Sequence, residues 1–219
     1  MTPEPPLRAD AQRNRERILT AARELFRERG TAVALDDIAR RAGVGAGTLY
    51  RRFPDRDALI RQVMVDGFDI CLSAVRAAHQ ELEDPAGALE RLFRRVVEQR
   101  ERLVLPLIGG PVVHDPRVQE LQHAIRDGVE EILAAGRAAG VVRSDVTSED
   151  LITAAAMACR PMPHLPAEVS AALAVRHVAV YLHGLRPEGA APLPAVAPSP
   201  EAIGRHVAMH QRDSEEAPR

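Results

Sequence analysis

Apolar positions recur at helical spacing along most of the chain, and no stretch alternates between apolar and polar residues as a strand does. In the first apolar stripe, within residues 10–29, apolar side chains lie four, seven and eight positions after the first one, which places all of them on one face of a helix. Gly30 follows directly and provides a helix stop. Two much shorter stripes cover residues 35–42 and 46–53, separated by Gly43. We therefore expect one long and two short helices at the start of the chain.

The rest of the chain continues the helical pattern. One long stripe begins at the cap residue Asp55 and ends before Pro85, and it predicts a single long helix. Further helices are predicted over residues 89–97, 118–140, 148–159 and 167–185. A segment around Pro106, Gly109 and Pro116 breaks the pattern. Thr147 followed by Asp150 is close to a capping box and marks one helix start. No repeat of about 20 to 50 residues is present. Because the stripes have helical spacing and no strand pattern occurs, the expected fold class is all-α.

The composition is that of a globular protein. Among 219 residues, 46% are apolar and 27% are charged, near the usual proportions. The uncharged run of residues 103–113 is far shorter than the roughly 20 residues that cross a bilayer. The N-terminus lacks a signal-peptide pattern, so we expect a cytoplasmic protein with no membrane partner. Cys71 and Cys159 lie in apolar helical stripes, as buried thiols do.

Positive charge is concentrated at the N-terminal end. Residues 1–62 hold 13 Arg against 9 acidic residues, whereas the remaining 157 residues hold 16 Arg against 22 acidic residues. The overall charge of −2 therefore combines a basic first part with an acidic body. This separation favours a polyanionic partner for the first part only.

The two short helices and the turn between them have the proportions of a helix-turn-helix. Gly43 can adopt the left-handed conformation that such a turn requires, and Ala39 and Ala42 are small where the two helices must cross. The second helix is expected to turn Leu49 and Phe53 inward. Its outer face then carries Ala46, Gly47, Thr48, Tyr50, Arg51 and Arg52. Arginine pairs with guanine edges and a tyrosine hydroxyl suits a phosphate, so this face favours duplex DNA.

The same residues resemble the DNA-binding domain of the TetR family. The matching motifs are Arg17-Ile18-Leu19, Ala21-Ala22, Leu25-Phe26, Asp37-Ile38-Ala39, Ala42-Gly43-Val44 and Gly47-Thr48-Leu49-Tyr50 with Phe53. They lie within residues 13–62, about a quarter of the chain. The resemblance implies a homodimeric transcriptional regulator, usually a repressor, whose C-terminal helices bind a small ligand and form the dimer. It also assigns the DNA contacts to Ala46, Gly47, Thr48, Tyr50, Arg51 and Arg52, with Arg56 on a phosphate.

Two positions depart from the family pattern. Ala34 stands where many members have a serine or threonine that caps the first short helix and reaches a phosphate, and Gly45-Ala46 replaces a commonly polar turn. The acidic pair Asp36-Asp37 complements the positive end of that helix but repels a nearby phosphate backbone. We therefore expect sequence discrimination to depend mainly on Arg51-Arg52.

Other chemistries lack supporting context in the sequence. The glycines at 43, 45 and 47 follow a helix, whereas phosphate-binding loops follow a strand. His206 and His210 have a metal-ligand spacing, but they lie in a segment typical of a solvated tail. No Ser/His/Asp set, carboxylate pair or metal cluster is apparent. We therefore expect no enzyme activity, no metal and no cofactor.

An effector pocket is expected inside each C-terminal domain. Prolines interrupt the helices near residues 106–111 and 161–163, and interrupted helices leave gaps. Its predicted lining, for which core packing is the competing explanation, comprises Met64, Phe68, Cys71, Leu72, Phe93, Val97, Leu107, His114 and Ile125. The candidates to orient a carbonyl or carboxylate are His114, His123 and Arg160. With only six aromatic residues in the chain, a flexible or alicyclic apolar ligand is favoured.

The homodimer is expected to form through the helix that starts near Ser148 and the one that ends near Leu185. The second is apolar on all sides and must be buried on all sides. The predicted organisation is a helix-turn-helix domain over 10–55, an effector-binding and dimerisation domain over 56–186, and a proline-rich tail over 187–219. The expected function is that of a repressor released from a palindromic DNA operator by a small apolar effector. An architectural or activator protein without a small-molecule sensor is the alternative.

Overall fold

The computed structural model describes residues 6–104, 115–160, 162 and 165–194. Within these ranges every regular element is a helix and no strand is present, so the predicted all-α fold class is confirmed. The elements are α1 (Pro6–Arg29), α2 (Leu35–Ala42), α3 (Ala46–Arg52), α4 (Arg56–His79), α5 (Pro85–Glu98), the 3₁₀ turn η1 (Arg100–Arg102), α6 (Pro116–Ala138), α7 (Ser148–Ala158) and α8 (Ala167–Gly184).

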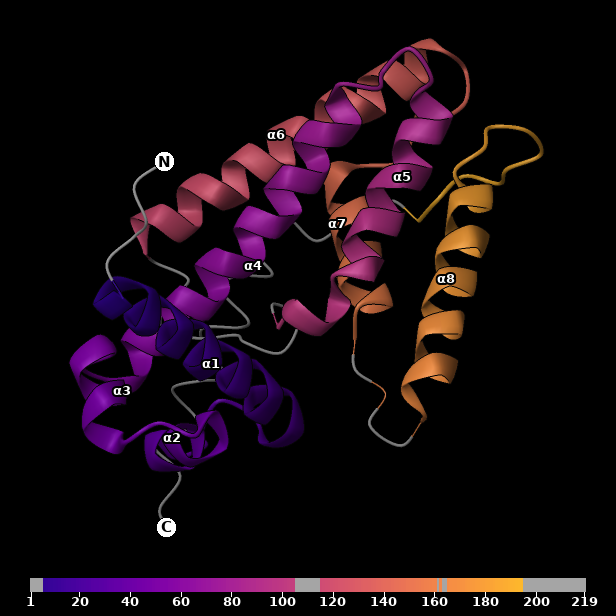
Figure 1. Cartoon of the computed structure of the whole chain (residues 1–219). Helices are drawn as coiled ribbons and strands as arrows, with labels where there is room; N and C mark the ends of the chain where they lie inside the picture. Colours follow the sequence, from indigo (N-terminus) through magenta and orange to yellow (C-terminus); the bar gives the residue numbers. More distant parts are fainter. Residues whose placement is uncertain (1–5, 105–114, 161, 163–164, 195–219) are drawn as a thin grey trace.

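The helices are arranged as a small N-terminal unit and a longer body (Figure 1). The helices α1, α2 and α3 lie together at one end of the molecule. From there α4 runs into the body, where it packs along α6 and α5. The last helix, α8, lies on the far side of α5 and contacts only α5 and α7 extensively among the described elements. The helix α4 is therefore the element common to both parts.

Local capping signals fix several of the helix starts. The Asp55 side chain accepts a hydrogen bond from the Ala58 amide at 2.7 Å, at the start of α4. The capping box between Thr147 and Asp150 at α7 is confirmed. The long helix predicted to end before Pro85 stops earlier, at His79, because residues 80–84 form turns and Asp84 caps α5 instead.

Two hydrophobic cores divide the molecule. The N-terminal core includes the fully buried Phe26 and Leu49, and it extends into the first two turns of α4 as far as Met64. The second core fills the body between α4, α5, α6 and α7, and it takes only Ala174 and Val178 from within α8. The start of α4 therefore packs as a fourth helix of the N-terminal unit.

The first part of the predicted tail is held against the body. The Leu193 amide donates a hydrogen bond to Asp145 Oδ2 at 2.9 Å, and the Arg143 guanidinium donates to the Ala191 carbonyl. Arg143 also pairs with Asp145, and this hydrogen bond together with the Leu193 amide holds the pKa of the Asp145 carboxyl well below its usual range. Residues 187–194 are therefore tied to the loop between α6 and α7, while residues 195–219 lie outside the described ranges.

Candidate DNA-binding surface and effector groove

The turn between α2 and α3 depends on Gly43. Its backbone is left-handed, with φ 62° and ψ 38°, as the sequence predicted. Arg17 of α1 donates a hydrogen bond from Nη2 to the Gly43 carbonyl at 2.8 Å. A Cβ atom at position 43 would lie 2.5 Å from the same Nη2 atom. Backbone conformation and the arginine contact therefore both favour glycine at this turn.

The helix α3 is anchored on its inner side and exposed on its outer side. Leu49 and Phe53 are buried in the N-terminal core, as their positions predicted. The residues assigned to DNA contact occupy the outer side: Ala46, Gly47, Tyr50, Arg51, Arg52 and, at the start of α4, Arg56 are exposed, and Thr48 is partly exposed. Tyr50 is 45% exposed, so its ring and hydroxyl are accessible to a partner.

The three arginines on this surface differ in their present contacts. Arg51 folds back along its own helix, where Nε donates to the Gly47 carbonyl at 3.2 Å and Nη2 lies 3.5 Å from Thr48 Oγ1. The guanidinium groups of Arg52 and Arg56 make no hydrogen bond or ion pair with any described residue. Two of the three are thus free to meet a partner, and Arg51 must leave only weak contacts to do so.

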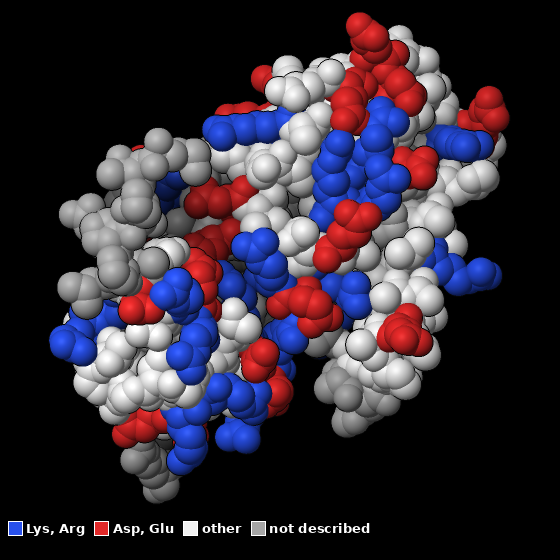
Figure 2. Space-filling model, viewed as in Figure 1, with Lys and Arg blue, Asp and Glu red and all other residues white. Residues whose placement is uncertain are grey.

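The helix α2 adds one cation that the sequence analysis did not single out. Arg41 joins α2 to α1 by pairing with Glu24 at 3.2 Å and Glu28 at 3.0 Å, and these bonds raise the pKa of Arg41. Arg40, one position earlier, pairs only with Asp37 of its own helix, and its side chain is 78% exposed. Arginine side chains gather over the end of the molecule that carries α1–α3, mixed with acidic ones (Figure 2). Arg40 therefore adds an exposed cation on α2 to the exposed arginines of α3 and of the start of α4, whereas Arg41 holds α2 against α1.

The α2 N-terminus lacks a side-chain cap. Ala34 is the N-cap residue and makes no side-chain hydrogen bond, as expected from its methyl group. The cap residue of α3 is Gly45, which likewise makes none. Both helices thus have unpaired backbone amide groups in their first turns, which can meet an anion such as a phosphate.

Ion pairs with Asp66 of α4 and Glu101 of η1 join α1 to the body. Arg23 is only 6% exposed and donates from Nη2 to Asp66 of α4 at 2.6 Å. Gln62 donates to the other oxygen of Asp66 at 2.7 Å. Burial lowers the pKa of Arg23, and Asp66 opposes that shift. Farther along α1, Arg27 donates to the Glu101 carbonyl of η1 at 2.9 Å and also pairs with the Glu101 carboxylate.

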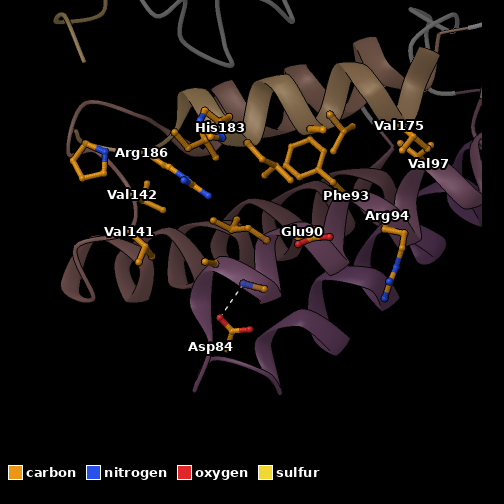
Figure 3. Close-up of a pocket in the computed structure, with 18 of the residues that line it drawn as sticks. Asp84, Glu90, Phe93, Arg94, Val97, Val141, Val142, Val175, His183 and Arg186 are labelled. Carbon is orange, nitrogen blue, oxygen red and sulfur yellow. Dashed lines mark hydrogen bonds between the residues drawn. The ribbon is translucent and has the colours of Figure 1, made fainter. Parts of the chain in front are cut away.

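A groove opens in the body between α5 and α8. It has a volume of about 1040 Å³ and is closed at one end by the loop between α6 and α7. Figure 3 shows Phe93 and Val97 of α5 on one side and Val175 of α8 on the other, with Val141 and Val142 at the closed end. Phe93 also packs against the Tyr181 ring, with centroids 5.6 Å apart. Most of the side chains that line the groove are apolar.

The predicted pocket residues that the structure describes are distributed over four places: the groove, the two cores and the exposed surface. Phe93 and Val97 line the groove. Phe68, Cys71, Leu72 and Ile125 belong to or pack against the body core, and Met64 is buried in the N-terminal core. His123 and Arg160 are exposed, while Leu107 and His114 lie outside the described residues. The structure therefore does not bring the predicted set together at a single hollow.

The residues that α8 and the α6–α7 loop contribute to the groove were not among those predicted from the sequence. These include Val142, Val175, Val178, Leu182, His183 and Arg186. Residues 167–185 are apolar on all sides, which indicates that this helix has apolar neighbours. The pattern does not indicate that α5 is the helix that it faces. Cys159 is buried and Cys71 is half-buried, and burial raises the pKa of the Cys71 thiol to about 11 and that of Cys159 to about 12, which disfavours the reactive thiolate.

Some chemistries have no support in the described part of the chain. No group of three or more His, Cys, Asp or Glu side chains there is placed to hold a metal ion. None of the described helices combines the length and the hydropathy needed to span a bilayer.

Family models match both parts of the chain. The model for bacterial regulatory proteins of the tetR family matches residues 18–63, and the model for the C-terminal domain of SbtR-like transcriptional regulators matches residues 84–187. An HTH-type transcriptional regulator of Staphylococcus aureus (strain USA300) is 40% identical over 68 residues, which are 31% of this chain and 37% of that protein. The chain thus spans little more than a third of the curated relatives that it matches.

Solved structures match over nearly the whole described fold. The TetR transcriptional regulator SCO0520 from Streptomyces coelicolor is 33% identical, with 80% of this chain and 99% of that chain covered and a TM-score of 0.55. LfrR from Mycobacterium smegmatis, solved with proflavine, shares the fold at 22% identity and a TM-score of 0.53, over 77% of this chain and 95% of its own.

A helix-turn-helix unit followed by a helical body defines a DNA-binding transcriptional regulator. The chain belongs to the TetR family. The resemblance found in the sequence is therefore confirmed, and it extends to the C-terminal body, for which the sequence motifs alone had shown only a compatible pattern.

Proposed function

We propose that this protein is a repressor that binds a palindromic DNA operator as a homodimer and leaves it when a small effector binds. It acts in the cytoplasm, has no enzyme activity and uses no cofactor. The observation that carries the DNA-binding part is the exposed outer side of α3, where Tyr50, Arg51 and Arg52 stand beside an anchored turn. Aromatic and arginine side chains left exposed on a short, rigid helix are typical of a major-groove reader.

The contacts divide by chemistry into base readers and phosphate binders. Arg51 and Arg52 are the long donors on the outer side of α3, and arginine recognises guanine with two hydrogen bonds. Tyr50 and Arg56 are assigned to phosphates, and Arg40 of α2 joins them. Ala46, Gly47 and Thr48 provide a small surface that lets the helix approach the bases closely.

The dimer is proposed to form through α7 and α8. Val169, Leu173 and Val180 of α8 are spaced by four and seven residues, so they share one helix face, and all three are exposed. Met157 of α7 is 65% exposed. An apolar face of this kind favours a second copy of the chain. A two-fold dimer would set the two α3 helices about 34–36 Å apart on the DNA, one helical turn.

The effector response rests on the body and its groove. Family membership supports a regulator of this kind, and the related fold of LfrR holds a small molecule. We assign residues 10–55 to DNA binding, residues 56–186 to effector binding and dimerisation, and residues 187–219 to the tail. Since α4 belongs to both cores, a shift of α4 changes the position of the N-terminal unit. An effector acts only if it binds the DNA-free state more tightly than the DNA-bound state.

The first test is selection of a binding site from random duplexes, followed by titration of variants on the selected duplex and on a scrambled one. Arg51→Ala and Arg52→Ala should each cost about 1–3 kcal/mol on the selected duplex and reduce discrimination. Arg56→Ala should weaken both duplexes alike and lower the salt dependence by about one unit of slope. Discrimination that survives both α3 substitutions contradicts the assignment of the base readers.

A selected site without two-fold symmetry, or the absence of any preferred site, would instead favour the architectural alternative. An activator is distinguished by transcription from a promoter that carries the selected site: the repressor lowers it and an activator raises it.

A further inference from the structure

The groove between α5 and α8 leaves apolar surface exposed on the side of the body that carries α8. Phe93 and Val97 come from α5, and Val175, Val178 and Leu182 come from α8. Val175 is 60% exposed although it stands on the wall of a concave surface. The volume of the groove, about 1040 Å³, is at the upper end of the range for small-molecule sites. Concave apolar surface of this size favours a ligand with an elongated apolar body.

The closed end of the groove is held in place by backbone contacts. Val141 and Val142 form this wall, directly after α6. The Arg143 amide donates to the Leu185 carbonyl at 2.8 Å, which joins the loop to the end of α8. The α6–α7 loop is therefore held to the end of α8, next to Arg186.

Most charged side chains of the groove already have a partner. Asp84 caps α5 by accepting from the Gly87 amide at 3.0 Å, and Arg94 lies 4.0 Å from Glu98. Arg100 lies 3.5 Å from the Ala167 carbonyl. Asp84 and Arg100 thus hold helix ends, whereas the Arg94–Glu98 contact is long and exposed and leaves the Arg94 guanidinium accessible.

The Arg186 guanidinium differs because it makes no hydrogen bond or ion pair with any described residue. Figure 3 shows its side chain extending from the end of α8 into the groove, whereas the Arg94 side chain points away from α8. Glu90 of α5 also has no partner among the described residues and lies farther along the groove, below Phe93. A free guanidinium beside apolar walls is suited to a carboxylate, which it meets with two parallel hydrogen bonds.

We infer that this groove binds an organic molecule with an elongated apolar body and one terminal carboxylate, and that the carboxylate pairs with Arg186. The apolar body lies along Phe93 and Val175, where it covers surface that is now exposed. Glu90 disfavours the anion farther along the groove, whereas at the other end the Arg186 guanidinium offsets the charge of Glu188, which also lines the groove. That this ligand acts as the effector rests on the proposed function; that it binds does not.

The groove also has a short structural route to α1. Arg100 lines the groove, contacts the first residue of α8 and lies 3.6 Å from Glu101. Glu101 in turn holds Arg27 of α1. A ligand that separates α5 from α8 therefore acts on η1, and through η1 on the N-terminal unit.

The test measures binding of laurate to the full-length protein by titration calorimetry, in the absence of DNA. Arg186→Gln should weaken laurate binding about ten- to a hundredfold, the effect of losing a hydrogen bond to a charged group. Arg94→Gln is the matched control, because it removes the same group from the same groove where the guanidinium points away, and it should leave the affinity within about twofold. Glu90→Gln should tighten binding by a few fold. Dodecyltrimethylammonium, with the same chain and the opposite charge, should bind more weakly than laurate.

The location is tested with tryptophan, since the chain contains none. Val175→Trp places a single fluorophore on the groove wall, and laurate should shift its emission to shorter wavelength. Gln80→Trp, at the exposed end of α4, should show no shift.

Three results overturn the inference: no laurate binding by the unaltered protein, equal affinities for Arg186→Gln and the unaltered protein, or tighter binding of the cation. Thermal unfolding of each variant shows whether it is folded. Because no DNA is present, these outcomes are independent of whether the protein recognises an operator.

Discussion

The helices α2 and α8 show how differently the two parts of the molecule are completed. The eight residues of α2 include four buried ones, whereas the eighteen residues of α8 include two, Ala174 and Val178. Yet α8 is the more apolar helix and leaves Val175 and Val180 at 60% and 68% exposure. The N-terminal unit buries its apolar residues within one chain. The body keeps apolar surface that a second copy or a ligand can cover.

This difference has a physical consequence for the two functions. A reading surface needs rigid side chains, and α3 gains that rigidity from Leu49, Phe53 and the turn at Gly43. A sensor needs a part of the structure whose packing changes when a ligand arrives. In the proposed regulator the incompletely covered α8, which faces the groove on one side, is the candidate for that part.

The largest expected effect contrasts the two cores through stability. Phe26 is 1% exposed in the N-terminal core, so Phe26→Ala should lower the free energy of unfolding by about 3–5 kcal/mol. Val175→Ala, on the groove wall, should change it by less than about 0.5 kcal/mol, because the side chain is already in contact with solvent. Chemical denaturation at one fixed protein concentration measures both. A loss at Val175 as large as the loss at Phe26 would show that the groove is filled.

The next effect is on assembly. Leu173→Glu puts a carboxylate on the apolar face of α8 in both copies of a two-fold dimer, where like charges cost several kcal/mol. Sedimentation should show a shift from dimer to monomer at micromolar concentration. Thr20→Glu, an equally charged change on the exposed side of α1, should leave the assembly unchanged. A dimer that tolerates Leu173→Glu must use another surface.

The sequence predicted the N-terminal unit almost to the residue. The bounds of α2 and α3, the left-handed Gly43 and the burial of Leu49 follow from local signals: helical period, a glycine stop and the residue before a proline. Arg40 was missed because its significance depends on which of two adjacent arginines pairs with α1. Such a choice is made in three dimensions and leaves no trace in the spacing.

The body was predicted as a set of helices but not as an arrangement. The facing of α5 and α8 joins residues roughly ninety positions apart, so no local period encodes it. The predicted pocket used the apolar stripe of α4, yet Met64 and Leu72 belong to two different cores. An apolar residue in a helix predicts burial; it does not specify which neighbour buries it. The groove could be found only once the helices were placed.

A smaller effect tests whether the two parts are joined through η1. Arg27 and Glu101 form a partly exposed ion pair, for which a coupling of about 0.5–1 kcal/mol is expected. Arg27→Glu and Glu101→Arg should each lower stability, and the double variant should recover part of the loss. The carbonyl contact of Arg27 is not restored by the exchange, so recovery should be incomplete.

The same double-variant cycle should be measured on operator affinity. Coupling in stability without coupling in DNA binding would show that η1 holds the two parts together but does not transmit a signal. Arg94 and Glu98, a pair within α5, provide the control that should show no coupling to DNA.

The smallest expected effect concerns the tail and depends on pH. The Arg143 guanidinium and the Leu193 amide lower the pKa of Asp145 in the folded protein. A carboxyl whose folded pKa is depressed contributes stability above its unfolded pKa, about 3.9, and loses that contribution as the pH falls through the folded pKa. Asp145→Asn should therefore lower the Tm at neutral pH, and the difference from the unaltered protein should shrink as the pH falls below about 4.

Hydrogen exchange at the Leu193 amide gives a local measure of the same contact. Exchange should be faster in Asp145→Asn than in the unaltered protein at neutral pH, because the amide loses a charged acceptor. Asp127→Asn, at an exposed carboxylate with no partner among the described residues, should change neither the Tm profile nor this exchange rate. A Tm difference for Asp145→Asn that stays constant down to the lowest accessible pH would mean that the carboxylate charge is not what holds residues 187–194 to the body.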